Sequence, residues 1–245
     1  MKLWQKGAAA HEKVDAFTVG KDREYDLVLA QYDCEASMAH ANMLGKIGLI
    51  TANEAEQLCA VLSRLKTSVA AGDFTIEDEF EDMHSKIEHV LTAELGDLGK
   101  KIHTARSRND QVLVAMHLYL KQALKEVKAD VVSLFDLLLE LAEKHQKDLL
   151  PGYTHLQVAM PSSVGMWLSA YAESLIDDLY FWEAAYKMAD QNPLGSAAGY
   201  GSSFPIDREL TTKLLQFDQL KVNAVAAQMS RGKLEKSTAT ALSSI

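Results

Sequence analysis

The sequence has little cysteine, little proline and no excess of basic residues. Its 245 residues include only two cysteines, Cys34 and Cys59, each with apolar neighbours. That number gives no disulfide framework and indicates buried thiols in a reducing compartment. The formal net charge is -9, and no basic cluster compensates for it locally, which argues against a nucleic-acid partner. We therefore expect a cytoplasmic protein that does not bind nucleic acid.

Long apolar runs are also missing. The N-terminal stretch MKLWQKGAAAHEKVD has no apolar core long enough for a signal peptide, and charged residues interrupt every later apolar run. These features predict no association with a membrane. Hydrophobic residues nevertheless make up 48% of the chain, which is enough to bury a sizeable globular core.

Strand signals are weak, and helix signals recur along the chain. All four prolines lie after residue 150, and no long stretch alternates as a half-buried strand does, so we expect no substantial sheet. The stretch T51-A-N-E54 has the form of a capping box, followed by apolar residues at helical spacing up to Gly72. One amphipathic helix is therefore predicted with both ends marked.

Two longer helices are predicted further along. Residues 111–150 contain no glycine or proline and would extend roughly 60 Å as one helix. A second helix is expected over residues 163–189, with an apolar stripe that includes Trp167, Tyr171 and Trp182 and is expected to lie in the core. Such a long rod needs neighbouring helices, possibly from other chains. We expect an all-α fold, with a small helical N-terminal domain over residues 1–105 and a long-helix bundle over residues 106–245.

One segment is unusually rich in hydrogen-bond donors. It reads HTARSRNDQ over residues 103–111, and we call it the donor-rich segment. Free backbone amides and partial positive charge are typical of a helix N-terminus, so this segment is suited to carboxylates or phosphates. The alternative is that its arginines pair with Asp and Glu while Asn109 or Asp110 caps the helix.

Other polar segments are also candidates. In PGYTHLQ, residues 151–157, His155 has Thr154 and Gln157 beside it and is suited to proton transfer, although a lone loop histidine can be purely structural. Asp33, Ser37 and His40 share one face at helical spacing.

Two further patterns are weaker. The stretch NPLGSAAGYGSSFPIDR has three glycines but no Gly-Lys-Ser/Thr ending, so we interpret it as a tight surface turn. His84 and Glu88 stand one helical turn apart, but no second ligand pair at metal-binding spacing accompanies them. We predict no metal site.

The motifs together resemble those of a known family. HTARSRNDQV, PGYTHLQ, SMAH, NPLGSAAG and FPIDR are similar to the argininosuccinate lyases, members of the fumarase and aspartase superfamily that includes the delta-crystallins. The resemblance covers essentially the whole chain. It implies an all-helical homotetramer with a central long-helix bundle, in which segments of three chains build each active site.

The resemblance also implies a reaction, the reversible elimination of argininosuccinate to arginine and fumarate, without a metal or organic cofactor. The carboxylate next to the deprotonated carbon must carry dianion-like charge, which requires preorganised donors. By motif, His155 would handle protons or orient the base, and Thr154 and Ser37 would donate from hydroxyls. The remaining candidates for binding substrate are Arg108, Asn109, Arg106, Ser107 and Gln157.

The sequence departs from the family pattern in places. Trp4 is not followed by the Gly-Gly-Arg-Phe of the family, and Ala105 replaces a glycine, a small change where the backbone φ is negative. Of a Ser-Asp-Arg-Asp motif only Arg231 is retained. The chain ends at ALSSI, before the loop that carries the expected serine base and a lysine. We therefore expect the C-terminal part to be absent and these 245 residues alone to be inactive.

Two alternatives stay open. A related lyase acting on adenylosuccinate, aspartate or malate would keep the chemistry and change the leaving group. A non-catalytic structural homologue or fragment would form a stable oligomer without elimination activity.

Overall fold

A computed structural model describes residues 12–245, and the predicted all-α class is confirmed. The residues before 12, including Trp4, lie outside the described part. The helices are α1 (Glu12–Val19), α2 (Asp22–Lys46), α3 (Ala52–Ala71), α4 (Met83–Leu95), α5 (Asp97–Lys100), the short 3₁₀ helix η1 (Lys101–His103), α6 (Arg108–Lys144), α7 (Val164–Ala189), α8 (Arg208–Leu214), α9 (Ala224–Met229) and α10 (Lys233–Ser244).

The chain forms two compact units. Of the described residues, unit 1 contains 12–119 and 190–231, and unit 2 contains 120–189 and 232–245. The first turns of α6 belong to unit 1 because Val114, Ala115 and Leu118 are buried in its core. The division after residue 105 expected from sequence remains a proposal about functional domains.

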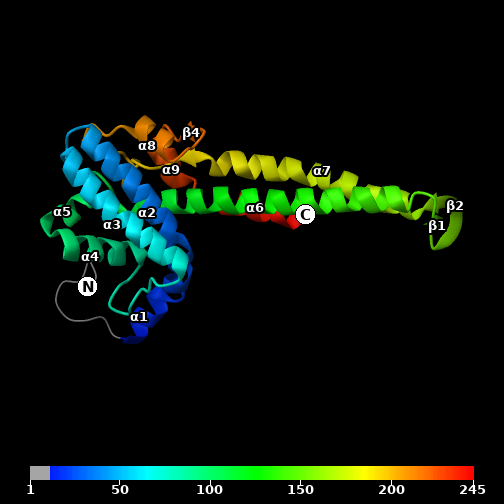
Figure 1. The fold of residues 1–245 in the computed structure, drawn as a ribbon, viewed down its shortest axis with the longest axis horizontal. Helices are drawn as coiled ribbons and strands as arrows, with labels where there is room; N and C mark the ends of the chain where they lie inside the picture. The colour runs from blue at the N-terminus through cyan, green and yellow to red at the C-terminus, as the bar shows by residue number, and fades with distance from the viewer. Residues whose placement is uncertain (1–11) are drawn as a thin grey trace. The chain divides into compact units, whose positions relative to one another are not determined.

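Unit 1 is built on the packing of α2, α3 and α4 (Figure 1). Leu44 of α2, Leu58 and Leu62 of α3, and Ile87 and Leu91 of α4 are at most 2% exposed. Burying each of these side chains contributes roughly 1.5–3 kcal/mol. This core holds the start of α4, and with it the side chains that face the donor-rich segment.

The predicted ends of α3 are confirmed. The Thr51 hydroxyl accepts from the Glu54 amide, and the Glu54 carboxylate accepts from the Thr51 amide at 2.7 Å. Gly72 ends the helix in the left-handed conformation with φ 79°. Local sequence signals therefore account for both ends of this helix.

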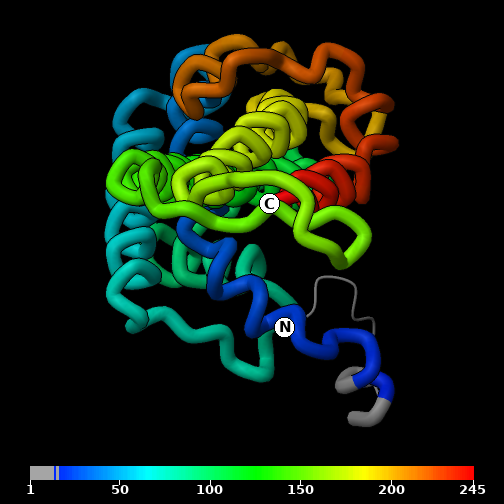
Figure 2. The backbone as a smooth tube through the Cα atoms, turned by 90° about the vertical axis from the view of Figure 1, so that its right-hand side faces the viewer, coloured from blue at the N-terminus to red at the C-terminus, as the bar shows by residue number. Residues whose placement is uncertain are grey.

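Unit 2 contains most of α6 together with α7 and α10. Helix α10 packs against α7, and Figure 2 shows the two side by side. The long helix is confirmed, although it begins at Arg108 and ends at Lys144. Trp182 is buried and donates from Nε1 to the carbonyl of Leu124 at 2.6 Å. Trp167 and Tyr171, expected in the core, are 52% and 53% exposed.

The segment between the two long helices is a β-hairpin, where the sequence predicted a loop. Strand β1 (Leu149–Thr154) pairs antiparallel with β2 (Gln157–Ser163), with Thr154 opposite Gln157. His155 and Leu156 form the turn with φ 50° and 64°, as the two-residue turns that match strand twist require. A short parallel pair, β3 (Gln191–Asn192) with β4 (Gln219–Leu220), also forms. No described helix is long and apolar enough to span a membrane.

Candidate active site

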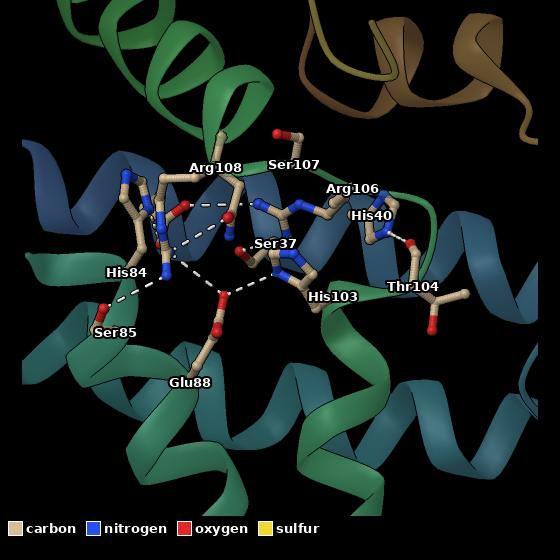
Figure 3. A network of polar contacts seen from close by, with 12 residues as sticks. Ser37, His40, His84, Ser85, Glu88, His103, Thr104, Arg106, Ser107 and Arg108 are labelled. Carbon is tan, nitrogen blue, oxygen red and sulfur yellow. Dashed lines mark hydrogen bonds and ion pairs between the residues drawn. The ribbon is translucent and has the colours of Figure 1, made fainter. Parts of the chain in front are cut away.

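The polar face predicted on α2 is present in unit 1. Asp33, Ser37 and His40 are 1%, 2% and 1% exposed. Buried polar side chains are costly unless they have partners. Figure 3 shows Ser37 and His40 close to the Arg106 side chain and the Thr104 backbone, both from the donor-rich segment. This face of α2 therefore forms the surface on which that segment lies.

A chain of buried polar groups runs from α4 through α2 to the donor-rich segment. His84 Nδ1 lies 3.0 Å from Asp33 Oδ2, and Arg106 Nη2 lies 3.6 Å from Asp33 Oδ1. Arg106 Nη1 donates to Ser37 Oγ at 3.0 Å. Burial raises the pKa of Asp33 to about 6, although the positive charges of Arg106 and Arg108 lower it.

His40 anchors the donor-rich segment at a second point. Its Nε2 lies 2.9 Å from the carbonyl oxygen of Thr104. Burial, together with the nearby charge of Arg106, holds the pKa of His40 well below its usual value. The ring is therefore neutral at pH 7, and because a carbonyl only accepts, its Nε2–H donates to Thr104.

Arg108 lies among several acceptors and makes short contact with none of them. Charge-assisted hydrogen bonds are normally about 2.7–2.9 Å long, so its guanidinium keeps donor capacity for another ligand. The contacts are Nε to Asp82 Oδ2 at 3.4 Å, Nη1 to Glu88 Oε1 at 3.4 Å, Nη1 to Gln111 Oε1 at 3.3 Å, and Nη2 to Ser85 Oγ at 3.4 Å.

The pairing of the arginines with acidic side chains, one alternative left open by the sequence, is thus present in the structure. Arg106 faces Asp33, and Arg108 faces Asp82 and Glu88. The long distances at Arg108 distinguish the two arginines, because Arg106 is fully buried while the Arg108 side chain is 24% exposed. Arg108 is the arginine of this segment that is open to a ligand.

A cavity adjoins these residues in unit 1. Its volume is about 500 Å³, and Ser85, Glu88 and His103 are among the residues that line it. Glu88 links the cavity to the segment, since it contacts both His103 Nδ1 at 3.1 Å and Arg108. A cavity of this size is in the range of small-molecule sites.

The orientation of Asn109 is set by its neighbours. Ser107 Oγ accepts from the Asn109 backbone amide at 3.3 Å and from Nδ2 at 3.2 Å. Arg231 Nη2 donates to the Asn109 carbonyl at 3.2 Å and to its Oδ1 at 3.0 Å. The Asn109 side chain is therefore held by both Ser107 and Arg231, and no pattern in the sequence indicated that Arg231 would be its partner.

The glycine-rich segment after α7 was predicted to be a surface turn, which is wrong for its first part, because residues 192–196 are buried, whereas Tyr200 and Phe204 further along are exposed. Asp110 is 0% exposed, and its Oδ2 accepts from the backbone amides of Gly195 at 3.0 Å and Ala197 at 3.1 Å. Its Oδ1 accepts from the Ser107 amide at 2.9 Å. Asp110 thus caps α6, as one alternative held, and also binds a segment 85 positions away.

Ala105 adopts a backbone conformation that favours glycine. Its φ is 59°, in the left-handed region that costs an L-residue roughly 1–2 kcal/mol. From the sequence, the change from the family's glycine to alanine is expected to be small if φ is negative. Because φ is positive, that condition is not met. The donor-rich segment therefore carries local strain at the residue before Arg106.

Replacing Ala105 with glycine is expected to raise the free energy of unfolding by roughly 0.5–1 kcal/mol, because glycine adopts this φ without strain. Thermal and urea unfolding measure the change. Ala60→Gly on the exposed face of α3 is the matched control and should lower the free energy by about 1 kcal/mol. A loss of stability in both variants would contradict the strain at Ala105.

The remaining predicted site residues lie in unit 2. Thr154, His155 and Gln157 sit at the exposed tip of the hairpin. A positive φ at Leu156, which is 97% exposed, is unusual for a leucine, and strained backbone of this kind is enriched at functional sites. The structure thus brings together the site residues of unit 1, and separately those of the hairpin.

The metal alternative is not supported among the described residues. His84 turns to Asp33 and Glu88 turns to His103 and Arg108. Residues 12–245 contain no group of three or more His, Cys, Asp or Glu side chains that could hold a metal ion.

Comparison with known proteins gives a family match. A family described as lyase matches residues 8–242. The chain is 57% identical to the argininosuccinate lyase of Phocaeicola vulgatus over 244 residues, covering 100% of this chain and 55% of that protein. It is 44% identical to the argininosuccinate lyase of Thermotoga neapolitana, covering 96% of this chain and 59% of the other. The chain thus spans about half the length of the curated relatives it matches.

Solved structures share the fold. An EDDS lyase in complex with formate superposes with a TM-score of 0.80 at 24% identity, over 96% of this chain and 46% of the other. A fumarate lyase:delta crystallin from Brucella melitensis gives a TM-score of 0.71 at 16% identity, over 89% of this chain and 54% of the other. At these identities the likeness supports the fold alone.

Proposed function

The chain belongs to the lyase family, and on that premise we propose that the complete polypeptide catalyses the reversible elimination of argininosuccinate to arginine and fumarate, a step of arginine biosynthesis. The observation that carries the choice of substrate is the 57% identity over the whole chain to the argininosuccinate lyase of P. vulgatus. The donor capacity of Arg108 supports the same choice, because the substrate presents several carboxylates.

In the proposed reaction a base removes a proton from the carbon next to a succinyl carboxylate. That carboxylate then carries dianion-like charge until the bond to the guanidinium nitrogen breaks and the carbon–carbon double bond forms. Donors aimed at the developing charge lower the barrier most. Arg108 and Asn109 would bind succinyl carboxylates, and the Ser37 hydroxyl, which accepts from Arg106, would still have its own hydrogen to donate.

The hairpin would supply the groups that move protons. His155 would transfer a proton or orient the base, Thr154 would donate its hydroxyl, and Gln157 and Ser107 would support substrate binding. Arg106 belongs to the polar cluster of unit 1. Because it is fully buried, it would support the substrate-binding residues without being exposed itself. The proposed chemistry uses no metal or organic cofactor.

We also propose a homotetramer in which the hairpin of one chain and the donor-rich segment of another share an active site. Unit 2 leaves many large apolar side chains exposed, as expected of helices and a hairpin that are covered by other copies. They are Val132, Leu134, Leu137, Leu139, Leu149, Val158, Met160, Met166, Trp167, Tyr171, Ile176, Tyr180 and Phe181. A cytoplasmic location is part of this proposal, and both cysteines are free.

A substrate panel tests the proposed function. The complete polypeptide is incubated with argininosuccinate, adenylosuccinate, aspartate and malate, and fumarate is followed by its ultraviolet absorbance. Fumarate from argininosuccinate alone supports the proposal. Release only from another substrate would assign the chain to a related lyase, and an oligomer that releases none would be a structural homologue.

Arg108→Lys is expected to raise KM for argininosuccinate about 10-fold or more, because a point charge replaces a planar fork that binds carboxylate bidentately. Steady-state kinetics on the complete polypeptide measure this. Arg64→Lys, at a surface ion pair with Glu94, is the control and should leave KM unchanged. An unchanged KM in the Arg108 variant would remove Arg108 from the substrate site.

A further inference from the structure

We propose that Asp33 and Arg106 form a positioning pair. Asp33 holds the Arg106 guanidinium, and Arg106 fixes the donor-rich segment on α2. The pair thereby places Arg108 and Asn109 correctly but does not itself contact the substrate. This inference rests on the proposed function and deepens it.

Burial rules out direct contact between Arg106 and a ligand in the cavity. Its side chain is 0% exposed. The guanidinium donates from Nη1 to Ser37 Oγ at 3.0 Å, which ties the segment to the middle of α2. Arg106 therefore acts on the segment and through it.

Two anchors hold the segment just before its ligand-binding residues. His40 binds the Thr104 carbonyl, and Arg106 binds Ser37. Arg108 follows two residues after Arg106, at the first position of α6. A shift of the Arg106 guanidinium would therefore be passed directly to Arg108.

Asp33 also joins the segment to α4. Its second carboxylate oxygen lies 3.0 Å from His84 Nδ1, and α4 also carries Ser85 and Glu88, which contact Arg108. One carboxylate in α2 thus contacts both of the elements that surround the Arg108 guanidinium.

Burying the Asp33–Arg106 ion pair costs free energy. Arg106 Nε and Nη2 and both Asp33 oxygens are buried without a hydrogen bond of good geometry. Replacing a buried ion pair by apolar residues is often neutral or stabilising, so this pair is not explained by stability. Placement of the donor-rich segment is the role that its contacts support.

The first variant is Asp33→Asn in the complete polypeptide. It keeps the shape of the side chain and removes its charge, and we expect kcat/KM for argininosuccinate to fall about 100-fold, as misplacement of binding groups by about 1 Å does. Glu35→Gln is the matched control. Glu35 is a partly buried carboxylate of the same helix, but it pairs with Lys66 Nζ at 2.6 Å and is not among the groups that contact the segment or the start of α4, so kcat/KM should stay within about twofold.

Asp33→Asn also leaves Arg106 buried without a counter-ion, so its Tm is expected to fall. The double variant Asp33→Asn with Arg106→Met separates folding from positioning. It removes both charges, and we expect Tm to return to near the value of the unmodified protein while kcat/KM stays about 100-fold low, because nothing then ties the segment to Ser37.

The outcomes are distinct. If the unmodified polypeptide releases no fumarate from argininosuccinate, the proposed function fails, and the inference fails with it. If the unmodified polypeptide is active and the double variant regains both Tm and kcat/KM, the pair is only structural and the inference alone is overturned. Normal kcat/KM in Asp33→Asn would overturn it as well.

Discussion

His155→Asn in the complete polypeptide is expected to lower kcat for argininosuccinate elimination roughly 100- to 10,000-fold, the usual contribution of a positioned general acid or base. An amide cannot accept and release a proton near neutral pH as an imidazole does. The effect should be on kcat more than on KM, because His155 is proposed to move protons and not to bind carboxylates.

The backbone conformation at residue 155 is one that asparagine can adopt without strain. His155 has φ 50° and lies at an exposed turn, and asparagine adopts this conformation readily. The hairpin should therefore form as before, and Tm should change by less than about 2 °C, since exposed substitutions without a special contact change stability little. Stopped-flow or steady-state fumarate release and thermal unfolding measure the two quantities.

His145→Asn provides the matched control. His145 lies just after the C-terminal end of α6 and pairs with Asp148 through Nδ1 at 2.7 Å, far along the sequence from any proposed site residue of unit 1. Its loss should leave kcat within about twofold, as expected for a surface substitution. Near-normal turnover in the His155 variant would remove this residue from the mechanism.

Asp110→Ala is expected to cost about 3–6 kcal/mol of unfolding free energy. It leaves three backbone amides without an acceptor, and each buried unpaired donor costs about 1–3 kcal/mol, less here because two of the three hydrogen bonds are only partly buried. The carboxylate is 0% exposed and accepts from Ser107, Gly195 and Ala197 at 2.9, 3.0 and 3.1 Å. Its removal would release both the start of α6 and the glycine-rich segment.

Urea unfolding of the complete polypeptide and its variants measures this cost. Asp110→Asn should lose less, since one amide oxygen still accepts while the amide nitrogen faces a donor. Asp207→Ala is the control, because Asp207 is exposed and caps α8 through the Leu210 amide at 2.8 Å; such caps contribute about 1 kcal/mol. An Asp110→Ala variant no less stable than the control would contradict this account of unit 1.

The helices could be predicted from sequence because their signals are local. The capping box at Thr51, the glycine at 72 and the unbroken apolar periodicity after residue 111 each depend on neighbours within a few residues. The hairpin was missed because its turn contains neither Asn-Gly nor Asp-Gly, and both strands carry a proline, Pro151 opposite Pro161. Pairing of that kind is set by contacts that a local pattern does not contain.

The candidate site, too, could be predicted from the sequence only where its signals are local. The polar face of α2 and the donor density before α6 are visible in the sequence, because residue type and helical spacing produce both. The partners of these residues are not visible in the sequence, because tertiary folding brings them together. These pairs are Asp33 with Arg106, Asn109 with Arg231, and Asp110 with the backbone amides of Gly195 and Ala197. The distinction between a buried Arg106 and an available Arg108, two residues apart, also requires the structure.

The central claim is that Arg108 and Asn109 bind the carboxylates of argininosuccinate. The most direct test is a crystal structure of the complete polypeptide, carrying His155→Asn to prevent turnover, with argininosuccinate bound. We predict a succinyl carboxylate within hydrogen-bond distance of the Arg108 guanidinium and the Asn109 amide, with Arg106 still on Ser37. Substrate carboxylates bound away from both Arg108 and Asn109 would contradict the account.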